Sequence, residues 1–179
     1  YMAIKDVRVG NSAAIISAGN TGVLMSLSKL ALKTIDGISR PAITTMLPSG
    51  AGDDRVVMLD LGANVQCSAE NLFDFAVLGS VYAEQIGKMP KPKLGVLNIG
   101  EEEEKGNQLV KDVHKLLKEN SIGLNFIGNV EGKELFQGNV DVVVCDGFVG
   151  NVALKTIEGS SMMLFKLIQQ EFKSDIISM

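Results

Sequence analysis

The chain has 179 residues, of which 46% are hydrophobic and 21% charged, and its formal net charge is −4. This length and balance predict one α/β domain with a substantial core, and they argue against extensive disorder and a dedicated nucleic-acid surface. No apolar run approaches the length of a membrane span, and no basic-then-apolar signal pattern opens the chain, so we expect a cytoplasmic protein.

The first expected elements are a strand and a helix joined by a glycine turn. Residues 13–18 are small and apolar, which predicts a strand. The turn Gly19-Asn20-Thr21-Gly22 follows, and apolar residues at helical spacing predict a helix from there to about Thr34. Ser17 and the polar residues of the turn would then lie at the carboxyl end of the strand.

Two extended segments, residues 38–47 and 56–61, predict a hairpin. The connection between them is too short for a crossover helix, so the two strands should be antiparallel and the sheet mixed. Asp60 and Asn64 stand at the carboxyl end of the second segment. A long helix follows, for which Ser68 is the expected N-cap.

Residues 94–99 predict a further buried strand, followed by an amphipathic helix. The glutamates 101–104 are expected at the start of this helix, where negative charge suits the helix dipole. His114, the only histidine, is expected on the helix surface among lysines. Residues 124–127 then predict a strand that ends at Gly128-Asn129, and residues 131–136 a short helix.

The stretch Val142–Lys155 is the one around which the chain is organised. Val142–Cys145 is a continuous apolar run, typical of a strand covered on both faces in a parallel sheet. Asp146 and Gly147 end this strand, and a helix is expected to open near Asn151. The free amides of such a helix start suit an anion such as phosphate. A plain strand-to-helix connection, with Asp146 and Asn151 as caps, is the alternative interpretation.

The last helix is expected to continue toward Lys173 with an apolar arc of about 200°, broader than one core contact needs. This excess predicts a second apolar neighbour. Another subunit, other parts of the same chain and a membrane surface all satisfy it.

Several strand exits carry amides, hydroxyls and backbone donors, and the carboxyl ends of parallel strands meet at one edge of a sheet. We therefore expect a shared cleft there, suited to phosphate binding and to stabilisation of a developing oxyanion. The candidates are Ser17, Gly19, Asn20, Thr21, Asp60, Asn64, Asn98, Lys105, Asn107, Asn129, Asp146, Gly147, Asn151 and Lys155.

The motifs that the sequence lacks limit the reactions that the protein could catalyse. The sequence has neither a P-loop nor a GxGxxG turn after a strand, and Cys67 and Cys145 are too few and too far apart for a disulfide framework or a metal site. Cys145 is interpreted as a small buried apolar residue, and a single histidine leaves no base for a side-chain nucleophile. A substrate that brings its own nucleophile, such as inorganic phosphate, would need none.

An ordered set of motifs resembles the PlsX family of acyl-acyl-carrier-protein:phosphate acyltransferases. The motifs are SAGNTGVLMSLSKL, RPAITTMLPS, MLDLGANVQC, FAVLGSVYAE, LGVLNIGEEEEKGN, NFIGNVEGKELF and VVVCDGFVGNVALKTIEG, in one register from Ser17 to Gly159. The resemblance implies that phosphate attacks the thioester of a long-chain acyl-acyl carrier protein. The products would be free carrier protein and an acyl phosphate that feeds bacterial phospholipid synthesis.

The resemblance also implies a three-layer α/β/α fold with a mixed, mostly parallel sheet, like that of isopropylmalate dehydrogenase and phosphotransacetylase. Family members are homodimers that associate peripherally with membrane, which places this protein at the inner face. They normally begin with a strand and an Asp-x-Met-Gly-Gly-Asp turn and continue past the last helix. Both parts are missing here, so the chain is expected to be a central portion.

Strand-end placement predicts the following roles, with no metal, nucleotide or redox cofactor. Phosphate would be held by Asn20, Thr21, Asn151 and the amides after Gly19 and Gly147, with Lys105 or Lys155 balancing its charge. Asp60 and Asp146 would orient these donors or position the attacking oxygen. The thioester carbonyl would be polarised by Asn64, Asn98 and Asn129.

Two other functions stay open from the sequence. One is a phosphotransacetylase-like enzyme that uses acyl-coenzyme A. The other is a non-catalytic module that binds a membrane or a partner protein through exposed apolar residues of the last helix, Met163, Leu164, Leu167 and Phe172.

Overall fold

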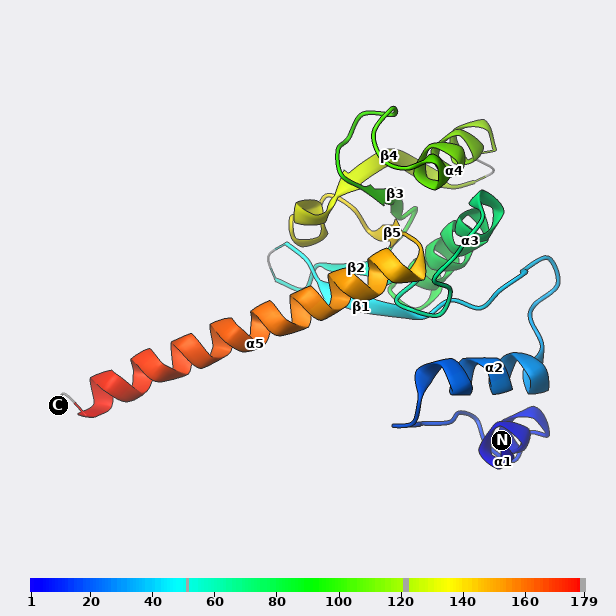
Figure 1. Cartoon of the computed structure of the whole chain (residues 1–179). Helices are drawn as coiled ribbons and strands as arrows, with labels where there is room; N and C mark the ends of the chain where they lie inside the picture. The colour runs from blue at the N-terminus through cyan, green and yellow to red at the C-terminus, as the bar shows by residue number, and fades with distance from the viewer. Residues whose placement is uncertain (51, 121–122, 178–179) are drawn as a thin grey trace.

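The computed structural model describes residues 1–50, 52–120 and 123–177. Within these residues one five-stranded sheet has the order β1-β2-β5-β3-β4 (Figure 1). Only β1 runs antiparallel to its neighbour, and the other pairs are parallel. This confirms the predicted mixed, mostly parallel sheet. The strands are β1 Thr44–Pro48, β2 Arg55–Leu59, β3 Lys93–Asn98, β4 Asn125–Glu131 and β5 Val142–Val144.

Helices α3 and α4 cover one face of the sheet and pack against each other. The other face is covered by the short 3-10 helix η1 and by the first turns of α5. The helices are α1 Met2–Arg8, α2 Thr21–Leu32, α3 Ala69–Gln85, α4 Gln108–Glu119, η1 Gly132–Phe136 and α5 Gly147–Ile177.

Strand β5 lies at the centre of the sheet and is buried on both faces. Val142 and Val144 belong to the core under α3 and α4, and Val143 and Cys145 belong to the core under α5 and η1. All three valines of the strand are fully buried. The prediction from the continuous apolar run is confirmed, because alternate side chains on such a strand must each find an apolar layer.

The predicted hairpin is also confirmed. Strands β1 and β2 pair in register from Thr44 opposite Leu59 to Pro48 opposite Arg55. The long helix that follows begins with Ser68 as N-cap, and Ser68 and Asn71 form a reciprocal capping box. Both features follow from local chemistry that the sequence displays.

The predicted strand 13–18 is wrong. These residues are irregular, they lie outside the sheet, and Ile16 is fully exposed. A short apolar run becomes a strand only where a sheet edge pairs with its backbone, and here the run connects α1 to α2, which pack on each other. The following helix does begin at Thr21, and the side chain of its N-cap Asn20 accepts a hydrogen bond from Val23 N at 3.0 Å.

Several helix and strand boundaries differ from the prediction, and β1 begins at Thr44 although the sequence predicts an extended segment from residue 38. The glutamates 101–104 lie in the loop before α4 because Gly106, at φ +88°, and the N-cap Asn107 start the helix only at Gln108. Strand β4 continues through Gly128-Asn129 to Glu131. Helix α5 begins at Gly147 rather than near Asn151.

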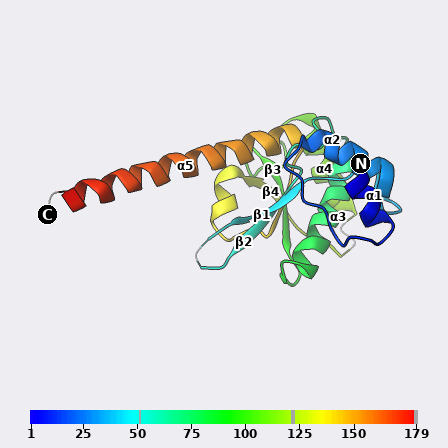
Figure 2. The same cartoon turned by 90° about the horizontal axis from the view of Figure 1, so that it is seen from below.

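Helix α5 leaves the sheet and projects away from it (Figures 1 and 2). Its 31 residues correspond to a length of about 46 Å. Beyond Ile157 its described side chains are exposed, and they include Met163, Leu164, Leu167 and Phe172, which are 51–67% accessible. Among the described residues, none of the helices combines the length and the apolar character needed to cross a membrane.

Candidate active site

The carboxyl ends of β5 and β3 form the point at which the chain changes faces of the sheet. The two strands are neighbours, and the helix after β3, α4, lies on one face while the helix after β5, α5, lies on the other. Open α/β sheets bind ligands in the crevice at such a switch point. A cleft of about 480 Å³ opens here, lined by Leu97, Asn98, Ile99, Gly106, Asn107, Val110, Gly132 and Val149.

Asp60, at the end of β2, is fully buried and organises the loop that follows it. Its Oδ1 accepts hydrogen bonds from Ile43 N at 2.9 Å and Ala63 N at 3.1 Å. Its Oδ2 accepts from Asn64 N at 2.6 Å and from Asn64 Nδ2 at 2.9 Å. With four donors around it, this carboxylate holds the β2–α3 loop in place and has no free face toward the cleft.

Asn64 joins this loop to the start of α5. Its Nδ2 also donates to Pro41 O at 2.8 Å, and its carbonyl oxygen accepts hydrogen bonds from Gly147 N at 2.8 Å and from the Cys67 thiol at 3.3 Å. The structure therefore brings Asp60, Asn64 and Gly147 together, as the exits of neighbouring parallel strands lead us to expect.

The glycines of the DGFVG motif allow this close approach. A Cβ on Gly147 would lie 2.8–3.0 Å from three backbone atoms of Asn64, and a Cβ on Gly150 would overlap the carbonyl oxygen of Asp60. Helix α5 is thus seated directly on the β2–α3 loop. The exposed side chain of Asn151 lies beside Gly62 of the same loop, where a Cβ would be 3.5 Å from it.

The first amides of α5 are already used within the protein. Asp146 Oδ1 accepts hydrogen bonds from Phe148 N and Val149 N, each at 2.9 Å, and the Asp146 carbonyl oxygen accepts from Gly150 N. The Gly147 amide donates to Asn64, as described above. The expected phosphate cradle after Gly147 is therefore occupied by Asp146, which agrees with the alternative interpretation of that residue as a cap.

Asn98 ends β3 and shapes the glutamate loop, residues 99–107, at the rim of the cleft. Its Oδ1 accepts from Ile99 N at 2.8 Å and its Nδ2 donates to Lys105 O at 3.1 Å. Gly106 packs so closely on Asn98 that a Cβ would overlap Oδ1. The Lys105 side chain is exposed, and within the described part of the chain its ammonium forms no ion pair.

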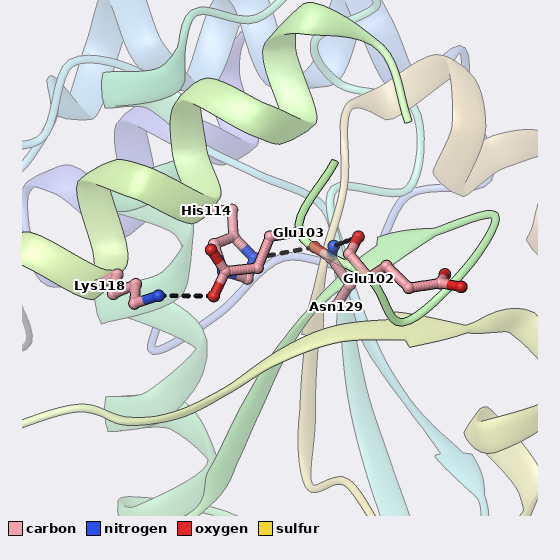
Figure 3. A network of polar contacts seen from close by, with 5 residues as sticks. All are labelled: Glu102, Glu103, His114, Lys118 and Asn129. Atoms are coloured by element: carbon pink, nitrogen blue, oxygen red, sulfur yellow. Dashed lines mark hydrogen bonds and ion pairs between the residues drawn. The ribbon is translucent and has the colours of Figure 1, made fainter. Parts of the chain in front are cut away.

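Asn129 lies under the glutamate loop rather than at a strand exit, because β4 continues past it. Its Nδ2 donates to Glu102 O at 2.9 Å and its Oδ1 contacts His114 Nδ1 at 3.1 Å (Figure 3). The expectation of a surface His114 is wrong, since its side chain is 8% exposed and packs edge-on against Phe126. Val110, Val113 and Leu117 flank it at helical spacing, and that signal places it on the buried face.

The remaining candidates lie elsewhere. Ser17, Gly19 and Asn20 line a separate cavity formed only by residues 1–27, and the Ser17 hydroxyl accepts a hydrogen bond from Gly19 N at 3.2 Å. Thr21 is exposed on the first turn of α2. Lys155 is exposed on α5, with its Nζ 2.8 Å from Glu158 Oε2.

Neither thiol is activated. Burial raises the pKa of Cys67 from 9.0 to about 11, and a stronger desolvation raises the pKa of Cys145 further. Cys145 is 3% exposed, which confirms its interpretation as a small buried apolar residue. A thiol that keeps its proton is a poor nucleophile, so the arrangement favours chemistry in which the substrates supply the reacting atoms.

Comparison with known proteins points to the same family as the sequence motifs. The family described as "Fatty acid synthesis protein" matches residues 1–179. The phosphate acyltransferase of Bordetella parapertussis is 51% identical over 99% of this chain and 50% of its own length, and that of Dictyoglomus turgidum is 52% identical over 98% and 52%. The chain thus spans about half the length of the curated relatives it matches.

Solved structures with a similar fold include a phosphotransacetylase from Streptococcus pyogenes, with a TM-score of 0.69 and 18% identity over 90% of this chain and 54% of that one. The EutD phosphotransacetylase from Staphylococcus aureus has a TM-score of 0.64 and 20% identity, over 89% and 55% of the two chains. At these identities the likeness concerns the fold alone.

Proposed function

Because the chain belongs to the fatty acid synthesis protein family, we propose that it serves as part of a phosphate acyltransferase, which transfers a long-chain acyl group from acyl carrier protein to inorganic phosphate. The observation that carries the proposal is the identity of 51–52% to proteins named phosphate acyltransferase over 98–99% of the chain. The products are an acyl phosphate and the free thiol of the carrier protein.

The reaction needs no nucleophile from the protein. A phosphate oxygen attacks the thioester carbonyl carbon, a C–O bond forms, and the carbonyl oxygen becomes an oxyanion. When this intermediate collapses, the C–S bond breaks and the thiolate leaves and takes up a proton. The protein has to hold a dianion beside the thioester and stabilise the oxyanion, which are tasks for cations and neutral donors.

For these tasks we propose Lys105 and Asn151, whose side chains are exposed. The Lys105 ammonium is exposed and without an ion pair in the described part of the chain, while that of Lys155 is engaged by Glu158. Asn151 is exposed on α5 beside the loop that Asp60 and Asn64 organise. We assign Lys105 to the phosphate charge and Asn151 to the phosphate or the oxyanion.

Other candidates take supporting roles in this proposal. Asp60, Asn64 and Asp146 position the loop and the helix start, and Asn98 positions the glutamate loop. A second set of proposed phosphate contacts consists of four exposed residues near the start of the chain, Ser17, Gly19, Asn20 and Thr21.

The test is release of free thiol from palmitoyl-acyl carrier protein, with and without added phosphate, by this chain and by a full-length relative. Phosphate-dependent release by both supports the function for this part alone. Release by the relative only assigns essential groups to regions outside this chain. If neither shows phosphate-dependent release, the proposal is wrong.

The acyl donor is tested separately, because the solved structures of similar fold are phosphotransacetylases. Rates with palmitoyl-acyl carrier protein and palmitoyl-coenzyme A are compared at equal concentration. The proposal expects a clear preference for the carrier-protein thioester. An equal or higher rate with the coenzyme A thioester would favour the phosphotransacetylase-like alternative.

We further propose that the outer part of α5 contacts a second copy of the chain and the inner face of the membrane. A helix that is apolar over most of its surface normally lies between other apolar elements, and here Met163, Leu164, Leu167 and Phe172 are exposed. This supports a homodimer and peripheral membrane association.

The test replaces those four residues by Gln and measures oligomeric state by sedimentation and membrane binding by pelleting with anionic liposomes. The control is Ile86→Gln, which changes an equally exposed apolar residue at the end of α3. Dimer formation and pelleting should fall in the fourfold variant alone. Unchanged values for both measurements contradict this role of α5.

A further inference from the structure

A buried pair of polar residues lies beneath the glutamate loop. Asn129 Nδ2 donates a hydrogen bond to Glu102 O, so Asn129 Oδ1 is the atom that faces His114. This oxygen can only accept, and the hydrogen bond at 3.1 Å is therefore donated by the N–H of His114 Nδ1. Asn129 and His114 are 6% and 7% exposed. Figure 3 shows the two side chains directed toward each other, from β4 and α4 respectively.

The Glu102 carbonyl oxygen links this pair to Lys105. It accepts from Asn129 Nδ2 at 2.9 Å and also from the Lys105 backbone N–H at 3.1 Å. On its other side, the Lys105 carbonyl oxygen accepts from Asn98 Nδ2 at 3.1 Å. The Lys105 N–H is therefore linked to the buried pair through the Glu102 carbonyl oxygen. The Lys105 carbonyl oxygen is held by Asn98 at the end of β3.

A second, outer contact joins α4 to the same loop. Glu103 Oε1 pairs with Lys118 Nζ, and it lies 3.6 Å from His114 Nε2, an ion pair when the ring is protonated. This contact is exposed, so it contributes little compared with the buried hydrogen bonds.

We infer that His114 and Asn129 are positioning residues that fix the glutamate loop, which lines the cleft through Ile99, Gly106 and Asn107, and thereby fix the backbone from which the Lys105 side chain extends. The role of Lys105 in this inference rests on the proposed function. The anchoring of the glutamate loop by His114 and Asn129 does not depend on that function. Neither residue reaches the cleft, since neither lines it. They act through the Glu102 carbonyl oxygen, and a buried amide whose oxygen and nitrogen both have hydrogen-bond partners is well suited to specify one loop conformation.

The test uses two conservative variants in this chain and in a full-length relative with the equivalent changes. Asn129→Asp keeps the shape but removes the donor to Glu102, and His114→Phe keeps the packing on Phe126 but removes the hydrogen bond to Asn129. The control is Asn125→Asp on the same strand, which removes a hydrogen bond of the same chemical type but at an exposed position, from Asn125 Nδ2 to Lys91 O at 3.0 Å, at the far end of β4.

The first readout is backbone amide hydrogen exchange over residues 99–107, which does not require activity. Exchange should accelerate about tenfold or more in Asn129→Asp and in His114→Phe, and stay unchanged in Asn125→Asp. Unchanged exchange in both buried variants overturns the inference, whatever the enzyme does. If His114→Phe fails to fold, the exchange rates of Asn129→Asp alone test the inference.

The second readout is a double-mutant cycle on kcat/KM for phosphate in the full-length relative. Asn129→Asp should lower kcat/KM about tenfold in the original background and less than about twofold when Lys105 is already Ala, because the pair acts through Lys105. Equal losses in both backgrounds would indicate a general structural role and contradict the inference. If the original enzyme shows no phosphate-dependent turnover, the proposed function fails and the exchange result still decides the anchoring.

Discussion

The seat of α5 on the β2–α3 loop makes Gly150 the most informative position to change. Gly150→Ala adds a Cβ that would overlap the carbonyl oxygen of Asp60 and lie 2.9 Å from Cys145 Sγ. Both neighbours are buried and belong to opposing elements, so the added methyl group has no direction in which to turn. The helix must therefore move away from the sheet edge.

The magnitude follows from two opposing effects. Replacing glycine by alanine inside a helix stabilises it by about 1 kcal/mol. Overpacking a well-filled site costs about 1–3 kcal/mol, and overlap with a backbone atom belongs at the upper end of that range. The net loss is about 2 kcal/mol in free energy of unfolding, which for a chain of this size lowers Tm by about 4–8 °C.

Urea unfolding followed by circular dichroism measures this loss, and Gly159→Ala is the matched control. Gly159 lies in the same helix, but nothing stands within 4 Å of an added Cβ. Gly159→Ala should therefore gain about 1 kcal/mol from helix propensity alone. If Gly150→Ala is as stable as Gly159→Ala, the close seating of α5 on Asp60 is refuted.

Three further outcomes are expected. Asp60 accepts four hydrogen bonds, and in Asp60→Asn an NH2 group faces some of the same N–H donors. Urea unfolding should show a free energy of unfolding that is lower by about 1–3 kcal/mol. Ser68→Ala removes half of a capping box and should cost about 1 kcal/mol, whereas a loss within error would contradict the cap. Because the folded state raises the pKa of Cys67 from 9.0 to about 11, it holds this proton more tightly than the unfolded state, so the associated stability is present below pH 9.0 and is lost as pH rises through about 11. The urea midpoint of the original chain should therefore fall faster over this range than that of Cys67→Ser.

The features predicted well from sequence are those with a local physical cause. The central strand is evident because three adjacent valines and a cysteine need apolar layers on both faces. The hairpin follows from a connection too short for a helix, and the cap at Ser68 follows from side-chain chemistry within three residues. Asp60, Asn64 and Gly147 meet because parallel strands share a carboxyl edge.

The features predicted poorly depend on contacts between distant segments. Whether residues 13–18 form a strand depends on a sheet edge that the sequence does not reveal. The hydrogen bond of His114 joins it to Asn129, 15 residues away on a strand longer than its pattern indicates, although the apolar residues around His114 on α4 already signal that it is buried. The cap by Asp146 is local and was open as an alternative from the sequence, whereas the hydrogen bond from the Gly147 amide to Asn64 depends on a loop more than 80 residues away.

The strand order has a consequence for how the chain folds. Strand β5 occupies the centre of the sheet, yet it is the last in sequence of the five described strands, about 80 residues after β2. At typical elongation rates the edge of β2 waits about 4–16 s and that of β3 about 2–9 s on the ribosome before their shared partner exists. Loop closure over this distance also makes the final pairing slow compared with the early hairpin. During that interval β2 and β3 lack the partner that pairs their facing edges in the folded sheet, and unpaired edges of this kind favour association with other chains.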